Sequence, residues 1–211
     1  MAKGYWIPQI DVSNPEGYKG YMAATPPAHE KYHGVALVRG GRMEVVEGRA
    51  RGRCVLREFP DYATALACYR SEDYQRARLL RLPHSQCDFI VAEGYDGAQP
   101  LSPSPPPPAG KKGYWIAQVD VTDTEGYKPY TVANQAPFGA FGARYLVRAG
   151  QKDVIEGRAR SRIVVLEFPS YDAALACYRS PAYQAAKNSV KARPRLISLL
   201  SKDTTARDSN K

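Results

Sequence analysis

The sequence lacks any long apolar run. No stretch among its 211 residues approaches the roughly 20 apolar residues that cross a bilayer as a helix. Residues 1–10 also have no apolar core of the kind found in secretory signals. We therefore expect a soluble, cytoplasmic protein that has no membrane as a partner.

Cysteine is scarce and shows no paired pattern. The four cysteines have no Cys-x-x-Cys spacing, and two of them occupy equivalent places in a helical pattern. Disulfide frameworks and metal sites show recognisable spacings, so the pattern favours small buried thiols in a reducing compartment. The four residues are Cys54, Cys68, Cys87 and Cys177.

Repeated histidines and the common catalytic signatures are missing as well. His29, His33 and His84 have no histidine at the equivalent positions of the duplicated half described below, which excludes a repeated histidine site. No nucleophile elbow, phosphate-binding glycine loop or dinucleotide fingerprint is present. We predict no metal and no cofactor, and leave open only ligation of a metal or haem by one half alone.

Acidic residues are fewer than basic ones. The chain has 30 Lys and Arg against 21 Asp and Glu, a formal charge of +9. A positive field attracts nucleic acid, anionic lipid or acidic ligands. No helix-turn-helix, zinc-finger or RNA-binding aromatic signature accompanies the charge, so nucleic acid is not an expected partner.

What the chain does contain is an internal duplication. The pentapeptide Glu-Gly-Arg-Ala-Arg occurs at 47–51 and at 156–160, an offset of 109 residues. The same offset relates Gly-Tyr-Trp-Ile at 4–7 to 113–116 and Ala-Cys-Tyr-Arg-Ser at 67–71 to 176–180. We predict two repeats, 1–97 and 113–201. A semi-rigid, proline-rich linker at 98–112 joins them and a disordered tail at 202–211 follows.

Both repeats show the same order of elements. In the first repeat, apolar periodicity predicts strands near 5–12, 37–39, 53–59 and 88–94, with a hairpin arm through 45–46. Capping residues at Asn14, Asp61 and Ser71 predict helix starts. Residues 25–34, where the copies diverge most, are expected to form a loop that sets specificity. This order fits the ferredoxin-like sandwich, with helices on one face of an antiparallel sheet.

The strand at 53–59, like its copy at 162–168, has apolar residues on both faces. A strand that is apolar on both sides is covered on both sides. The repeat's own helices supply one cover, and the sheet of the other copy is the obvious second. We predict an α+β fold in which two ferredoxin-like βαββαβ repeats pack their antiparallel sheets as a pseudo-dimeric α/β barrel.

Several motifs carry a family resemblance. They are Gly-Tyr-Trp-Ile at 4–7, Asp11, Tyr18, Tyr21, Leu-Val-Arg-Gly-Gly at 37–41, Glu47-Gly48, Glu58-Phe59-Pro60, Tyr69-Arg70-Ser71, Tyr74-Gln75, Arg81 and Glu93-Gly94. In these the chain resembles the domain of unknown function 1330 family over nearly all of both repeats. The resemblance implies the dimeric α/β-barrel superfamily, which includes cofactor-independent monooxygenases, chlorite-dismutase-like haem proteins and small isomerases. It implies no particular reaction.

The second copy departs from the family pattern at two places. Val190 stands where the first copy has Arg81, and Lys202-Asp203 stands where the first has Glu93-Gly94. If each repeat has a pocket, we therefore expect the two pockets to be non-equivalent.

Polar residues on the face of the first strand opposite Trp6 form our candidate site. If Trp6 packs on the helices, the opposite face points into the space between sheets, where a desolvated carboxylate can act as a general acid or base. The candidates for catalysis are Asp11, Glu58, Asp120 and Glu167. The expected ligand-binding residues are Tyr5, Gln9, Tyr18, Arg39, Arg81, Tyr114, Gln118, Tyr127 and Arg148. The alternative is that these groups form structural ion pairs.

Two hypotheses on function remain. The first is a barrel that binds a small, anionic metabolite in a pocket between sheet and helices, with a cofactor-independent reaction as an option. The second is a non-enzymatic module whose sheet faces associate, as a pseudo-dimer within one chain or as a homodimer. The repeated arginines at 49, 51 and 53 can hold a carboxylate or phosphate, but a solvated segment with glutamate partners is the simpler interpretation.

Overall fold

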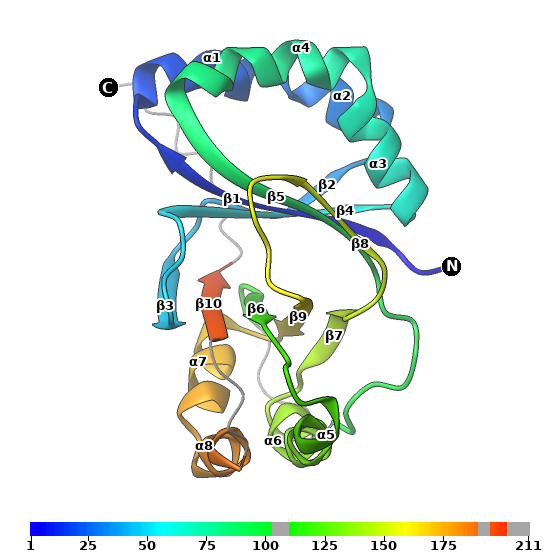
Figure 1. Cartoon of the computed structure of the whole chain (residues 1–211), viewed down its shortest axis with the longest axis vertical. Helices are drawn as coiled ribbons and strands as arrows, with labels where there is room; N and C mark the ends of the chain where they lie inside the picture. The colour runs from blue at the N-terminus through cyan, green and yellow to red at the C-terminus, as the bar shows by residue number, and fades with distance from the viewer. Residues whose placement is uncertain (103–109, 190–194, 202–211) are drawn as a thin grey trace. The chain divides into compact units, whose positions relative to one another are not determined.

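The computed structural model describes residues 1–102, 110–189 and 195–201. The chain divides into two compact units (Figure 1). The first unit comprises residues 1–37, 50–96 and 147–159, and the second comprises 38–49, 97–146 and 160–211. The predicted polyproline run at 103–108 and the predicted tail at 202–211 lie outside the described residues.

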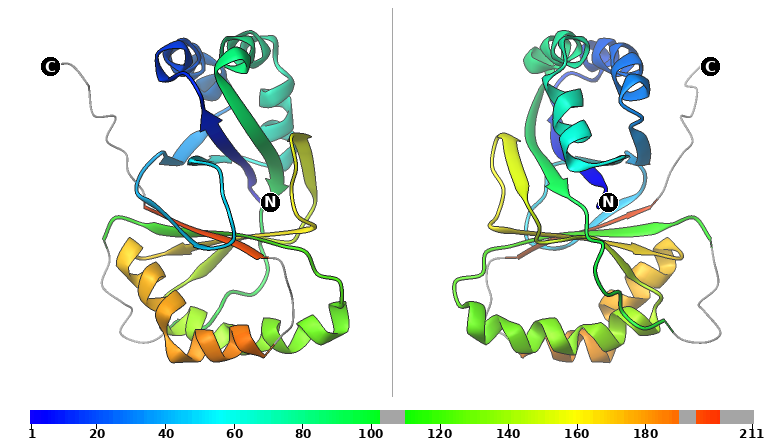
Figure 2. Two further views of the ribbon diagram at one scale, coloured as in Figure 1. Left: turned by 60° about the vertical axis from the view of Figure 1, so that its left-hand side comes forward. Right: turned by 90° about the vertical axis from the view of Figure 1, so that its right-hand side faces the viewer.

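The first unit is built on a five-stranded sheet of order β2-β4-β1-β5-β8. Helices lie on one face of this sheet (Figures 1 and 2). Its elements are β1 (Gly4–Val12), α1 (Pro15–Ala24), α2 (Pro26–Lys31), β2 (Val35–Arg39), β4 (Arg53–Phe59), α3 (Tyr62–Arg70), α4 (Glu72–Arg81), the short 3-10 helix η1 (Leu82–His84), β5 (Ser85–Glu93) and β8 (Lys152–Glu156).

The second unit repeats the plan, with the order β3-β10-β6-β9-β7. Its helices also lie on one face of the sheet (Figure 2). Its elements are β3 (Met43–Glu47), β6 (Gly113–Val119), α5 (Thr124–Ala133), α6 (Gln135–Ala140), β7 (Arg144–Arg148), β9 (Arg162–Phe168), α7 (Tyr171–Arg179), α8 (Pro181–Asn188) and β10 (Arg195–Ser201). The fold class is therefore the predicted α+β arrangement of two antiparallel sheets.

Each sheet takes one strand from the other repeat. The strand β8 pairs antiparallel with β5, and β3 pairs antiparallel with β10. The expected hairpin arm within each repeat is therefore wrong, since β2 and β3 belong to different sheets. The reason is physical: β5 and β10 would otherwise present unpaired backbone groups at a sheet edge, and the arm of the other repeat satisfies them.

Both exchanged strands carry an irregularity at the same place. Between Phe89 and Ile90 the register against β8 shifts, so that Phe89 faces Glu156 and Ile90 faces Val154. Such a bulge re-aims side chains. Here Ile155 packs against the helix-side core, and Glu156 also reaches a helix of that layer. The equivalent shift in the second unit sets Ile197 opposite Glu47.

In the first repeat, residues of the Gly-Tyr-Trp-Ile motif on the first strand contact the helix layer. Trp6 is 2% exposed, and its indole N–H donates to the carbonyl oxygen of Ala65 in α3 at 2.9 Å. A Cβ on Gly4 would lie 2.2 Å from the carbonyl oxygen of Asp61, so this close approach of β1 to the start of α3 requires glycine. Trp6 and Phe59 share the helix-side core, so the condition on which the candidate site was based holds for Trp6.

The predicted caps are confirmed, and one predicted loop is not. The side chains of Asn14, Asp61 and Ser71 each accept a hydrogen bond from a backbone N–H in the first turn of the helix that follows. Residues 25–34 contain α2 instead of forming a loop throughout, because Pro26 takes the first helical position, where the missing N–H costs nothing. In the described ranges, no helix is long and apolar enough to cross a membrane.

Candidate functional site

A buried carboxylate from the second repeat lies among the helices of the first unit. Glu156, at the end of β8, has a side chain that is 11% exposed. Its Oε1 accepts the hydroxyl of Tyr69 at 2.6 Å and Nε of Arg78 at 3.1 Å. The same oxygen accepts an Nη of Arg81. One carboxylate is therefore shared by two guanidinium groups.

Arg81 is the most deeply buried cation of this cluster. The residue is 1% exposed, at the end of α4, and its guanidinium lies 5.5 Å from the ring centre of Tyr21. Among the described residues, its buried Nε has no hydrogen-bond partner. Buried N–H donors are nearly always paired in native proteins, so this donor lacks an acceptor, which the described residues do not supply.

Four tyrosines line this end of the helix layer. The hydroxyls of Tyr21 and Tyr74 are 3.1 Å apart, and the rings of Tyr18 and Tyr21 are 5.1 Å apart. Tyr69 completes the set through its bond to Glu156. Tyr18 is 4% exposed, and its hydroxyl has no hydrogen-bond partner within the described part of the chain, but unlike Nε of Arg81 this atom is not fully buried.

The local electrostatics keep the Tyr18 hydroxyl protonated and the Glu156 carboxylate charged. Burial raises the pKa of Tyr18, outweighing the opposing charges of Arg53 and Arg81. Burial alone would raise the pKa of Glu156, but the Tyr69 hydrogen bond and the Arg81 charge hold it below its ordinary value. Because an arginine stays charged at any physiological pH, the cluster carries excess positive charge.

Where the structure describes it, the second unit has the same framework with fewer charges. Glu47 accepts the hydroxyl of Tyr178 at 3.0 Å, and Nζ of Lys187 lies 3.5 Å away. The hydroxyls of Tyr130 and Tyr183 are 3.2 Å apart, as in the first unit. The counterpart of Arg81 in the sequence is Val190, which lies outside the described residues.

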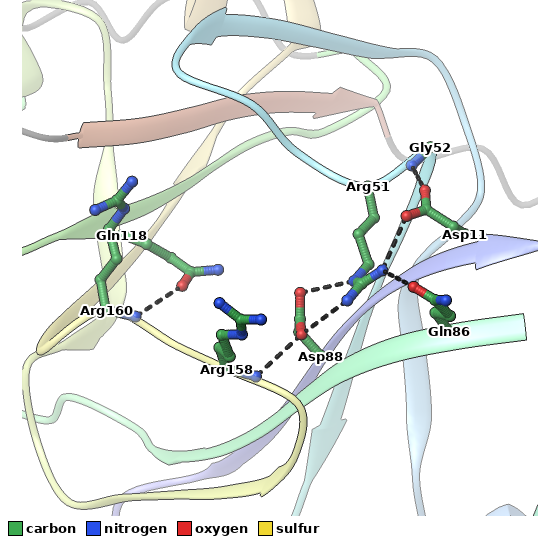
Figure 3. Close-up of polar contacts among 8 residues, drawn as sticks. All are labelled: Asp11, Arg51, Gly52, Gln86, Asp88, Gln118, Arg158 and Arg160. Carbon is green, nitrogen blue, oxygen red and sulfur yellow. Dashed lines mark hydrogen bonds and ion pairs between the residues drawn. The ribbon is translucent and has the colours of Figure 1, made fainter.

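The predicted carboxylate Asp11 lies in a separate ion-pair network (Figure 3). Arg51 donates to Asp11 at 2.9 Å and to Asp88 at 2.7 and 3.1 Å. Asp11 also accepts the backbone N–H of Gly52, and its side chain is 54% exposed. Asp11 thus forms an ion pair with Arg51, a contact of the structural kind that the sequence left as the alternative. A catalytic role for Asp11 stays a prediction.

Asp88 anchors the exchanged strand in the same network. Its Oδ1 accepts the backbone N–H of Arg158 at 3.0 Å (Figure 3). Burial alone would raise the pKa of Asp88, but hydrogen bonds from Arg51 and Arg158 lower it. Gly157 has φ +67°, and a Cβ there would lie 2.1 Å from the same Oδ1. The repeated Glu-Gly step is therefore a requirement of this tight approach.

The other predicted carboxylates are paired with tyrosines. Tyr5 donates to Glu58 at 2.9 Å, and Tyr114 donates to Glu167 at 3.3 Å. Asp120 accepts the backbone N–H of Ser161 and a bond from Arg160 at 2.7 Å, and these hydrogen bonds, the amide first, lower its pKa. Catalytic roles for these carboxylates stay predictions.

The remaining predicted ligand-binding residues are scattered. Gln9 is 3% exposed, and its Nε2 has no hydrogen-bond partner among the described residues. Gln118 accepts the backbone N–H of Arg160 at 3.3 Å (Figure 3). The ring centre of Tyr127 lies 5.7 Å from the Arg162 guanidinium. Arg148 donates to the Tyr95 hydroxyl at 3.1 Å. The side chain of Arg39 is exposed. Only Tyr18 and Arg81 belong to the Glu156 cluster.

The sequence did not single out Glu156, Arg78, Tyr21 or Tyr74 as a site. Glu156 is 75 to 87 residues away from its three partners along the chain, so no local spacing links them. The available signal was the identical Glu-Gly step in both repeats. The four cysteines are buried free thiols, as expected, and burial raises the pKa of Cys54 and Cys87 to about 12.

Comparison with known proteins identifies the repeats. A model of the family described as domain of unknown function (DUF1330) matches residues 3–95 and 112–196. No curated protein matches the chain in sequence.

Solved structures with a similar fold cover nearly the whole chain. An anthrone oxidase-like protein is 12% identical, with a TM-score of 0.53, over 95% of this chain and 90% of that one. A candidate monooxygenase from Fusobacterium nucleatum is 8% identical, with a TM-score of 0.52, over 96% and 92%. A mutant chlorite dismutase from Candidatus Nitrospira defluvii is 10% identical, with a TM-score of 0.50, over 94% and 91%. At these identities the likeness shows the fold alone, which is of the dimeric α/β-barrel type.

Proposed function

The chain belongs, in both of its repeats, to the DUF1330 family, and from that premise we propose that its first unit binds a small anionic metabolite. The ligand lies between the helices α1 and α4 and the sheet, against Arg81. The observation that carries the proposal is the buried Nε of Arg81, which has no hydrogen-bond partner among the described residues.

The net charge of the cluster around Glu156 determines the sign of the charge on the ligand. Arg78 and Arg81 share the single carboxylate of Glu156, and Arg53 lies close enough to Tyr18 to act on its pKa. A buried cation without full compensation is costly, because desolvation of the charge is only partly repaid. An anion at Nε of Arg81 supplies the missing charge and the missing acceptor together.

The buried amide of Gln9 is a weaker candidate for the same role. Its Nε2 also lacks a hydrogen-bond partner within the described ranges. Gln9 lies on β1 in the alternation opposite Trp6, and so on the sheet face away from the helices. A neutral amide attracts an anion far less than a guanidinium does, so Arg81 is the better anchor.

The proposal is tested by isothermal titration of the full chain with acetate, benzoate, succinate, phosphate and sulfate. We expect at least one anion to bind with one site per chain. Arg81→Met should abolish that binding, whereas Lys187→Met, which alters the equivalent cluster of the second unit, should leave it unchanged. Unfolding by urea shows that both variants are folded. Equal binding by wild type and Arg81→Met would refute the proposal.

A further inference from the structure

The number and chemistry of the unpartnered donors around Arg81 restrict the ligand further. This step rests on the proposed function of the first unit. Two donors of the cluster make no hydrogen bond within the described residues, Nε of Arg81 and the hydroxyl of Tyr18. The Arg81 guanidinium and the ring of Tyr18 both adjoin the Tyr21 ring, at 5.5 and 5.1 Å between centres.

Two donors match a carboxylate better than a phosphate. A carboxylate has two oxygens and one charge, so one N–H and one O–H satisfy it at least once on each oxygen. A phosphate brings three terminal oxygens and close to two charges at neutral pH. Beside only two open donors, it would keep an oxygen without a hydrogen-bond donor, which is unfavourable.

The surroundings of these donors are aromatic. Tyr74 packs edge-on against Trp6 at 4.8 Å between ring centres, and Tyr69 against Phe89 at 4.9 Å. All four belong to the buried helix-side core of the first unit. Aromatic side chains of this kind contact apolar and aromatic groups most favourably. The body of the ligand that accompanies the anionic group is therefore apolar.

We propose that the first unit selects a monocarboxylate with an apolar or aromatic body, whose two carboxylate oxygens accept from Arg81 Nε and the Tyr18 hydroxyl. The second unit does not share this selectivity, because Val190 replaces the arginine in its sequence. Tyr18 is then a binding residue with a defined partner, and its counterpart Tyr127 is a matched control.

The test compares three probes with the same aromatic body on the full chain: benzoate, benzyl alcohol and phenyl phosphate. We expect benzoate to bind with one site per chain, at least about tenfold more tightly than either of the others. Tyr18→Phe should weaken benzoate binding by about tenfold, as loss of a hydrogen bond to a charged group predicts. Tyr127→Phe should change it less than about twofold.

The outcomes separate this inference from the function on which it rests. Tighter binding of phenyl phosphate, or equal effects of Tyr18→Phe and Tyr127→Phe, would overturn the carboxylate assignment while leaving an anion site at Arg81. Binding of benzyl alcohol as tightly as benzoate would also overturn it. If no anion binds at all, the proposed function itself fails. Urea midpoints of the two tyrosine variants confirm that each is folded.

Discussion

The two units share a framework and differ in its charges. In the first unit, Glu156 bonds to Tyr69, Arg78 and Arg81, whereas in the second Glu47 bonds to Tyr178 and Lys187. The exchanged strand, its bulge and the tyrosine pair of each helix layer are common to both. The duplication therefore kept the architecture, and among the residues that the structure describes only the first unit pairs its glutamate with a buried arginine.

A second difference lies where the exchanged segment approaches the sheet. Asp88 of β5 lies opposite Gln9 and accepts bonds from Arg51 and from the backbone of Arg158, but the residue of β10 opposite the equivalent Gln118 is Leu196. Arg160 bonds instead to Asp120. The first unit thus anchors its borrowed strand with a buried polar network that the second unit cannot form in the same way.

Removal of the shared carboxylate should have the largest effect on stability. Glu156→Gln leaves Arg81 buried without a charged partner, so we expect a loss of about 3 kcal/mol in the free energy of unfolding. Glu47→Gln should cost about 1 kcal/mol, since it removes a longer contact to a lysine. Urea unfolding of both variants measures the difference. Equal losses of unfolding free energy would show that the two glutamates contribute equally to stability, contrary to the comparison between the units.

The glycines of the two Glu-Gly steps, Gly48 and Gly157, should tolerate replacement by alanine unequally. Gly157 and Gly48 both have positive φ, +67° and +74°, so alanine costs about 1 kcal/mol at either position. At Gly157 the new Cβ also meets Asp88 at 2.1 Å, and we expect Gly157→Ala to cost about 2 kcal/mol in total. Thermal unfolding of the two variants checks this. A larger loss for Gly48→Ala would contradict the role given to Asp88.

Arg51 and Arg160 are a third matched pair. Arg51 bonds to two carboxylates and Arg160 to one. We expect Arg51→Met to cost about 2 kcal/mol and Arg160→Met about 1 kcal/mol or less. A double-mutant cycle with Asp88→Ala shows whether the excess comes from Asp88. No coupling in that cycle would mean that the difference arises elsewhere.

The free energy of unfolding should decrease at acidic pH because Glu156 becomes protonated. Its pKa is lowered in the folded state from an ordinary value of 4.5. The stabilisation is therefore complete above about pH 4.5 and is lost as the pH falls through the folded pKa. In Glu156→Gln, the free energy of unfolding should decline less steeply over this range than in the wild type. Identical slopes would show that Glu156 is not held in its charged form.

The smallest effect should come from the carboxylates singled out in the sequence. Glu58 bonds to Tyr5, and its side chain is 28% exposed. Replacement of Glu58 and Glu167 by glutamine should cost less than about 1 kcal/mol and leave anion binding unchanged. Loss of binding, measured by titration with benzoate, would move the site from Arg81 to the opposite face of the sheet.

Local patterns predicted the elements well, because each has a local cause. Alternation fixed the first strand, capping side chains fixed the helix starts at Asn14, Asp61 and Ser71, and the repeated motifs gave the order. The helix α2 was missed because the divergence of the two copies at 25–34 was interpreted as a loop, although Pro26 favours the first position of a helix.

The exchange of strands and the Glu156 cluster could not be predicted from the sequence, and both for the same reason. Which edge β8 joins depends on the backbone groups of β5, about 60 residues earlier in the chain, and nothing in the local pattern of 152–156 records that choice. Tyr18 and Arg81 were named for their family pattern, yet their common surroundings follow only from the packing of α1 against α4.

The most direct test of the central claim observes the Arg81 side chain itself. In the NMR spectrum of the 15N-labelled full chain, the Nε–H signal of Arg81 can be assigned by its absence from Arg81→Lys. On addition of benzoate, the account predicts a large, saturable shift of this signal with one site per chain. Saturable binding of benzoate that leaves the Arg81 signal in place would contradict it.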